Sequence, residues 1–370
     1  MSSLNRRQRL QREATRLLDA GVAGQAFPGG VACVSWREGT ETAYVEVAAG
    51  RVRMGEAAVK ASTPYDLASL TKPIVAMTAL RLVAKGLLAL DTRTDSIVAD
   101  VRGGVGGVAT LEALLTHDAG LAAWGGLYLD VPHDPGTPAA RRWILSEASR
   151  RPVEGERAGP VYGDLGYIIA GEVIARASGE KLDRVVAREI TDVLGTSADM
   201  YYPVALPPDR RANVVREAAP TEWCEWRARL IRGEVHDENC AAFGGVAGNA
   251  GLFGTARSVA VFGRAVLDSL LGRSDFLPKE LVERALAPRE GTTLRLGWDS
   301  KSPKDSSAGK RMGPKTFGHL GFTGTSIWCD PDRDVVVVLL TNRVHPSRAN
   351  ERIKGFRPGF HDGLLAALGL

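Results

Sequence analysis

A serine and a lysine three positions apart are the first candidates for chemistry in this sequence. Ser69 and Lys72 stand at the head of residues 73–82, an apolar run whose one charge is Arg81, so a buried helix is predicted. Residues three apart share a helix face, and the Ser69 hydroxyl can cap the first turn. Burial would lower the pKa of Lys72 and provide a neutral amine as a base. The pair therefore predicts an activated serine nucleophile.

Spacing alone does not select this pair, because two other serines in the chain precede a lysine by three positions. Ser178 and Lys181 lie in a turn that ends a predicted helix, and Ser307 and Lys310 lie in a polar loop. Neither of these pairs opens an apolar helix. The context therefore selects the first pair, and other parts of the chain must supply its partners.

The elements that position this pair follow from the pattern of strands and helices. Strands are predicted over residues 29–36, 41–48, 293–298, 316–322, 325–329 and 334–340, and the first two read as an antiparallel hairpin. Helices are predicted over residues 1–20, 110–116, 137–149, 165–177, 182–194, 255–271 and 362–368, and a further helix around Trp223 and Trp226. Strands therefore occupy both ends of the chain, and helices occupy the middle.

This order predicts an α+β fold. One antiparallel sheet, built from both chain ends and flanked by helices, would carry an inserted and mainly helical lobe. The expected sheet domain takes residues 1–90 and 290–370, and the expected helical domain takes residues 91–289. A cleft between the two is the expected site.

Composition excludes several classes of protein. The chain has 370 residues, of which 44% are hydrophobic and 24% charged, with a net charge of +4. The mild charge disfavours a nucleic-acid binder, and without about 18 successive apolar residues no membrane span is predicted. Residues 1–20 carry five arginines and no apolar core, which is unlike a signal peptide. We therefore expect a cytoplasmic protein as the sequence is given, or a periplasmic or secreted one if a leader has been removed.

No metal or cofactor is predicted. The four cysteines lack C-x-x-C spacing, which disfavours a zinc site or a disulfide framework: Cys33, Cys224, Cys240 and Cys329. The glycine-dense residues 244–254 match neither phosphate-loop pattern. The absence of H-E-x-x-H and G-x-S-x-G motifs disfavours zinc peptidases and α/β-hydrolases.

Two further motifs complete a known order. Tyr162 and Asp164 form a Tyr-x-Asp motif before a predicted helix, and His319 and Gly321 form a His-x-Gly motif in a predicted strand. With Ser-x-x-Lys before them, these motifs resemble those of the SxxK serine hydrolases. The family includes the class C β-lactamases, the D-alanyl-D-alanine peptidases of the penicillin-binding proteins, and related esterases. The resemblance spans roughly residues 29–342.

The resemblance implies a role for each motif. Ser69 Oγ would attack a carbonyl carbon, while Lys72 and Tyr162 would share the proton as a coupled pair. The backbone N–H groups of Ser69 and Phe322 would form the oxyanion hole. The implied substrate-binding residues are Asp164, His319, Gly321, Trp124 and His236.

Two motif residues depart from the family pattern. Asp164 stands where an asparagine is common, and an ionised carboxylate only accepts hydrogen bonds, so it would hold Lys72 as a cation. This change disfavours β-lactam turnover and leaves ester or peptide chemistry open. His319 replaces the usual lysine and need not be charged at neutral pH, so an anionic substrate is not required.

Several of the remaining residues have two possible roles. Trp124 can line the cleft or cover the helical lobe, and His236 and Asp237 can reach substrate or brace their own loop. His133, His345 and His361 are expected at the surface.

Three functions are open at this point. The first is a metal-independent serine hydrolase that cleaves an ester or amide, such as a D-alanyl peptide or a β-lactam, through an acyl-enzyme at Ser69. The second is a carboxylesterase or transesterase that is inactive on β-lactams, and the third is a catalytically silent peptide-binding protein of the same fold. Each would take a small molecule or a short peptide as its partner.

Overall fold

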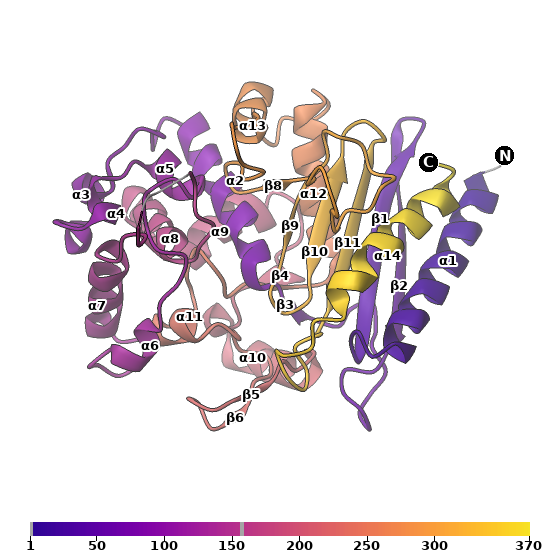
Figure 1. Cartoon of the computed structure of the whole chain (residues 1–370), viewed down its shortest axis with the longest axis horizontal. Coiled ribbons are helices and arrows are strands. Elements are labelled where there is room, and N and C mark those ends of the chain that lie inside the picture. Colours follow the sequence, from indigo (N-terminus) through magenta and orange to yellow (C-terminus); the bar gives the residue numbers. More distant parts are fainter. Residues whose placement is uncertain (1–2, 156–158) are drawn as a thin grey trace.

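The computed structural model of the chain describes residues 3–155 and 159–370. Figure 1 shows a sheet with α1 and α14 at one end of the molecule and a group of short helices at the other. Within the described residues, no helix has both the length and the apolar character needed to cross a membrane.

The main sheet has six antiparallel strands in the order β2-β1-β11-β10-β9-β8. Their bounds are β1 Gly29–Glu38, β2 Glu41–Gly50, β8 Asp299–Ser300, β9 Phe317–Leu320, β10 Ser326–Asp330 and β11 Val335–Thr341. The N-terminal hairpin joins the C-terminal strands through β1 and β11, with Val31 opposite Leu340. The predicted α+β fold, with a sheet made from both ends of the chain, is confirmed.

Alternation along β11 explains how helices cover both faces of the sheet. Successive side chains of a strand point to opposite faces. The odd-numbered residues 335–339 pack with α1 (Ser3–Ala23) and α14 (Ile353–Leu368). The even-numbered residues 336–340 belong to the core that includes α12 (Ala256–Leu270). A run of six aliphatic residues therefore fits a strand that is buried on both sides.

The helix α2 (Thr71–Ala84) runs between the sheet and the helical part (Figure 1), and almost all of its residues are buried. It packs against α8 and α9. The other helices are α3 Thr94–Ile97, α4 Val105–Val108, α5 Leu111–Leu115, α6 Leu127–Asp130, α7 Pro138–Ser149, α8 Leu165–Ser178, α9 Leu182–Val186, α10 Pro208–Glu217, α11 Glu238–Ala242 and α13 Lys279–Leu286. Short 3-10 helices are η1 Ala68–Leu70, η2 Ala99–Val101 and η4 Pro203–Ala205, and η3 Ala187–Thr191 is a π-helical segment.

Two small sheets lie outside the main one. The first contains β3 (Tyr65–Asp66), β7 (Phe253–Gly254) and β4 (Met200–Tyr201) in that order, and the second pairs β5 (Trp223–Cys224) with β6 (Arg229–Leu230). The strand β3 leads directly into η1 and α2, so the β3–β7 pairing fixes the segment that carries Ser69.

The predicted domain boundaries at residues 90 and 290 stay a prediction. The helix α12 lies inside the predicted insert, yet it packs against β1, β10 and β11 of the sheet.

Two predicted elements are wrong. The helix expected around Trp223 and Trp226 is the β5–β6 hairpin, in which Trp223 is exposed and Cys224 is buried, the alternation of a strand. Residues 293–298 are not a strand, because the N–H groups of Leu296 and Gly297 donate to Ala285 O and Leu115 O instead of a neighbouring strand.

The surface placement of two histidines is also wrong. His345 is 8% exposed and His361 is 0% exposed, whereas His133 is exposed as predicted. Each buried ring places its Nδ1 2.7 Å from a backbone oxygen, that of Thr221 for His345 and that of Arg357 for His361. These carbonyl oxygens satisfy a ring nitrogen that would otherwise lose its water partners.

Candidate active site

The nucleophile candidate lies in a strained turn. Ser69 is in η1, and Leu70 is the residue that precedes α2, so the prediction that Ser69 caps the helix is wrong. Ala68 has a φ of 49°, which is unfavourable for a residue with a Cβ atom. Asp66 Oδ1 accepts a hydrogen bond of 2.8 Å from the Ala68 N–H and supports this conformation. Strain of this kind clusters at functional sites.

Lys72 is fully buried and uses all three of its donors. Its Nζ donates to Ser69 Oγ at 2.8 Å, to Asp164 Oδ1 at 2.6 Å and to Asn249 O at 3.4 Å. Burial alone lowers the pKa of Lys72, but Asp164 and the Tyr162 phenol together raise it above its ordinary value. The prediction of a neutral amine is therefore wrong, and the prediction that Asp164 holds a cation is confirmed.

Tyr162 lies among neutral histidines. Its ring centroid is 5.1 Å from Lys72 Nζ, 4.7 Å from the His117 ring and 5.7 Å from the His319 ring. Burial, together with the charge of Lys72, lowers the pKa of His319 to about 3 and that of His117 well below its usual value. His319 Nδ1 lies 2.8 Å from Leu320 O and so carries the ring proton, which leaves Nε2 as an acceptor.

The turn after β9 brings Phe322 to the nucleophile segment. Thr323 Oγ1 donates to Asp66 O at 2.8 Å, and Thr325 Oγ1 donates to Leu67 O at 3.0 Å. A Cβ atom on Gly321 would stand 1.9 Å from Thr325 Oγ1, so glycine is needed for this close approach. The backbone N–H groups of Ser69 and Phe322 donate to no described residue, and both are available to an oxyanion.

A cavity of about 610 Å³ collects the predicted residues. It is lined by every predicted site residue except Lys72, which lies buried behind it: Ser69, Trp124, Tyr162, Asp164, His236, His319, Gly321 and Phe322. Trp124 thus lines the cleft, the first of its two readings. His236 both lines the cavity and braces its loop, because Nε2 lies 2.7 Å from Glu222 Oε1.

Two arginines in this cavity were not expected from the sequence. Arg343 is 8% exposed and Arg357 is 5% exposed, and neither has a carboxylate within 4.0 Å in the described part of the chain. Arg357 donates from Nη2 to Thr325 O at 2.8 Å, while its buried Nε has no partner among the described residues. Burial and then the nearby Arg343 lower the pKa of Arg357 to about 10. Both arginines lie after the last strand, β11, and outside the three sequence motifs, so no motif indicates them.

A second carboxyl group stands beside the Lys72–Asp164 pair. Asp237 lines the cavity and accepts from Cys240 N at 2.6 Å and from Asn249 Nδ2 at 3.3 Å. Burial and then the charge of Asp164 raise the pKa of Asp237 to about 6. Like His236, Asp237 both lines the cavity and braces its own loop, so both of its predicted roles remain open to it. The described residues contain no cluster of three or more His, Cys, Asp or Glu side chains arranged to bind a metal ion.

Comparison with models of known protein families gives one match over most of the chain. The family model described as Beta-lactamase matches residues 14–356. A relative from Escherichia coli (strain K12), provisionally named D-alanyl-D-alanine carboxypeptidase, is 29% identical over a 320-residue alignment that covers 78% of this chain and 72% of that protein.

Solved structures share the fold at lower identity. EstCE1, a hydrolase with promiscuous acyltransferase activity, has a TM-score of 0.76 and 17% identity, covering 98% of this chain and 100% of its own. A class C beta-lactamase from Rhodobacter sphaeroides has a TM-score of 0.66 and 18% identity, covering 97% of this chain and 100% of its own.

Proposed function

Because the chain belongs to the β-lactamase family, we propose that it is a serine hydrolase that cleaves an amide or ester through an acyl-enzyme at Ser69. The observation that carries this proposal is the 2.8 Å contact between Ser69 Oγ and Lys72 Nζ at the wall of a substrate-sized cavity. This contact places the nucleophile next to a fixed positive charge, which favours the negative charge that develops on Ser69 Oγ as it loses its proton.

In this proposal the base is Tyr162, because the ammonium of Lys72 has no free electron pair to accept a proton. The Tyr162 phenolate, stabilised by the positive charge of Lys72, removes the proton as Ser69 Oγ bonds to the substrate carbonyl carbon. The N–H groups of Ser69 and Phe322 stabilise the oxyanion. Tyr162 then protonates the leaving amine or alcohol as its bond to the carbonyl carbon breaks. In the second half, Tyr162 removes a proton from the attacking water, and Ser69 leaves with that proton.

The preferred substrate carries a carboxylate. Arg343 and Arg357 line the same cavity as Ser69 and have no carboxylate partner among the described residues. His319 stays neutral, so these arginines supply the positive charge that a neutral third-motif residue lacks. A peptide that ends in D-alanine fits this pattern, and the name of the Escherichia coli relative points the same way.

An esterase or transesterase inactive on β-lactams is the second candidate. Asp164 Oδ1 is committed to Lys72 at 2.6 Å and presents no amide to a substrate. A substrate ester that has no amide beside its carbonyl does not need the hydrogen bonds of an asparagine side chain, so an aspartate at this position does not weaken its binding.

Intact-mass measurement tests these candidates. The protein is exposed separately to a fluorophosphonate, a penicillin and a p-nitrophenyl ester, with Ser69→Ala as the control. We expect wild-type adducts that the variant lacks, and faster cleavage of an acylated D-alanyl-D-alanine peptide than of the same peptide with an amidated C-terminus. Equal rates on these two peptides would favour the esterase. No adduct with any probe would favour a silent binding protein.

A further inference from the structure

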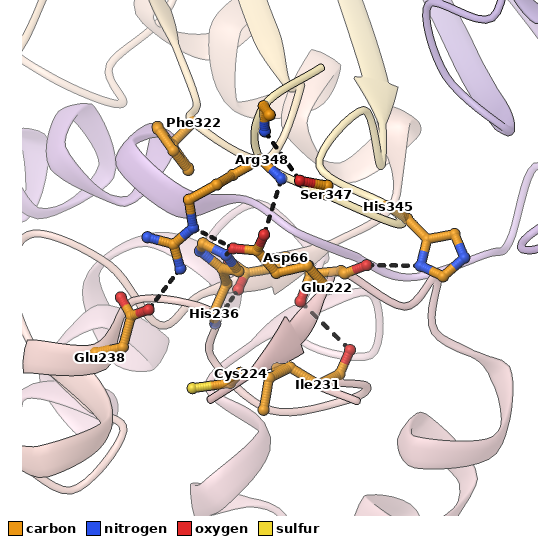
Figure 2. Close-up of polar contacts among 12 residues, drawn as sticks. Asp66, Glu222, Cys224, Ile231, His236, Glu238, Phe322, His345, Ser347 and Arg348 are labelled. Atoms are coloured by element: carbon orange, nitrogen blue, oxygen red, sulfur yellow. Dashed lines mark hydrogen bonds and ion pairs between the residues drawn. The ribbon is translucent and has the colours of Figure 1, made fainter. Parts of the chain in front are cut away.

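A buried carboxylate outside the motifs ties two loops together beside the cavity. Glu222 is 6% exposed, and its two oxygens accept from His236 Nε2 at 2.7 Å, from the Arg348 backbone N–H at 2.8 Å and from Arg348 Nε (Figure 2). Burial raises the pKa of Glu222, but these bonds from His236 and Arg348 outweigh it and lower the pKa to about 2. Glu222 is therefore ionised at any working pH.

Both partners of Glu222 contact the ring of Phe322. The His236 ring stacks on it with centroids 5.7 Å apart and an interplanar angle of 26°. The Arg348 guanidinium carbon lies 5.8 Å from the ring centroid, and Figure 2 shows this side chain between Phe322 and the acidic groups. Arg348 Nη2 also donates to Glu238 Oε1 at 2.5 Å. Glu222 thus fixes two of the groups that surround the Phe322 ring.

The same histidine is bonded to the turn that carries the nucleophile. The His236 backbone N–H donates to Asp66 Oδ2 at 2.6 Å, and the other oxygen of Asp66 accepts from the Ala68 N–H at 2.8 Å. One connected set of contacts therefore reaches the residue before Ser69 on one side and Phe322 on the other.

We propose that Glu222 is a positioning residue that holds the two N–H groups of the oxyanion hole in register, acting through His236 and Arg348. This proposal rests on the function proposed above. The two donors come from a turn after β3 and a turn after β9, and catalysis requires them within about 0.5 Å of their working positions. Phe322 is 49% exposed, so a small number of contacts holds its side chain. The backbone of this turn is held by bonds from Thr323, Thr325 and Arg343, the last of which donates from Nε to Phe322 O at 2.8 Å. A charged, buried and fully bonded carboxylate adds rigidity around the exposed Phe322 ring.

The variant Glu222→Gln tests the proposal, because it keeps the size of the side chain and removes its charge. Its matched control is Glu189→Gln. Glu189 is also buried, at 0% exposure, and pairs with Arg81 at 3.2 Å and Lys85 at 2.6 Å, but it does not line the cavity. Both variants remove the charge of a buried, paired carboxylate, so both should lose comparable thermal stability.

We expect the two variants to differ in catalysis. Oxyanion contacts act in the transition state, so Glu222→Gln should lower kcat about 10- to 100-fold and leave KM within about 2-fold. Glu189→Gln should keep the wild-type kcat. If Glu222→Gln does not fold, Arg348→Met, whose side chain is 46% exposed in the wild type, removes one contact of Glu222 and should lower kcat in the same direction.

Amide hydrogen exchange gives a readout that needs no activity. In Glu222→Gln, residues 321–325 and 343–350 should exchange about 10-fold faster than in the wild type, with no change there in Glu189→Gln. Equal kcat and equal exchange in the two variants would overturn the proposal. A wild type that forms no adduct at Ser69 would instead overturn the proposed function, and exchange alone would then decide whether Glu222 fixes the turn at Phe322.

Discussion

The two ends of the cavity differ in whether their buried cations are paired with a carboxylate. At one end, Lys72 has 0% exposure, and its Nζ donates hydrogen bonds to Ser69, Asp164 and Asn249. At the other end, Arg343 and Arg357 are almost as deeply buried and have no carboxylate within 4.0 Å among the described residues. The protein thus supplies a carboxylate to Lys72 and only backbone oxygens to the two arginines, within the described residues.

This difference assigns separate tasks to the two ends. A buried charge without an opposite charge beside it is costly, and it is retained where a ligand can supply that charge. The paired end therefore serves the proton transfer at Ser69, where a fixed cation is needed in every state of the enzyme. The unpaired end serves substrate selection, where the missing charge arrives with the substrate.

Removal of Lys72 gives the largest expected effect. Lys72→Met leaves Asp164 without its cation and Ser69 without its hydrogen-bond donor, so acylation by a p-nitrophenyl ester should slow by about 10⁴-fold or more. Intact-mass kinetics measure the rate, and Ser69→Ala sets the background. A rate within about 10-fold of the wild type would contradict the role given to the paired end.

Neutralising Asp164 should change the pH dependence of the site. In the wild type Asp164 helps to keep the pKa of Lys72 above its ordinary value. In Asp164→Asn that attraction is lost while burial still lowers the pKa, which should fall by about 1–3 units. The acylation rate should then begin to fall at a lower pH, because Tyr162 loses its neighbouring cation once Lys72 is deprotonated. Asp164→Glu, which keeps the charge, should retain the wild-type profile, and an unchanged profile in Asp164→Asn would refute this account.

Sequence motifs were sufficient to identify the residues at the paired end of the cavity, although not the charge state of Lys72. Three ordered motifs indicated Ser69, Lys72, Tyr162 and His319, and the family match confirms the resemblance on which they were read. The strands of the sheet could also be predicted, because they are rich in β-branched residues and either alternate apolar with polar residues or are apolar throughout. The charge state of Lys72 depends on Asp164, which is 92 residues away in the chain, so local context predicted a neutral amine.

The unpaired end left no comparable signal. Arg343 and Arg357 are ordinary residues after the last strand, and burial that depends on the folded chain makes them unusual. Glu222 was missed for a similar reason, since its two partners come from separate segments. The β5–β6 hairpin was not predicted, because strands of two residues are too short to show a periodic pattern of apolar residues.

Removal of Arg357 should affect selection and leave the chemistry intact. Arg357→Met keeps the apolar stem and loses the charge, so KM for a substrate with a free carboxylate should rise about 10- to 100-fold, as expected for a lost charged hydrogen bond. A neutral ester should react at the wild-type rate. The acylated D-alanyl-D-alanine peptide and its C-terminal amide provide the comparison. An equal rise in KM on both peptides would show that Arg357 acts only through folding.

The smallest expected effect of replacing Arg357 is on the stability of the protein at low pH, through the buried ring of His361. Burial lowers the pKa of His361 to about 4, and the charge of Arg357 adds to this shift. A histidine whose folded pKa lies below its unfolded value costs stability as pH falls from about 6.5 to 4. Arg357→Met should raise the folded pKa of His361, so the variant should lose less stability over that range, by about 0.5–1 kcal/mol at pH 4. Urea unfolding at pH 7 and pH 4 measures the difference. The same substitution made in a His361→Asn background should show no such gain, because no titrating ring is left for the arginine to repel.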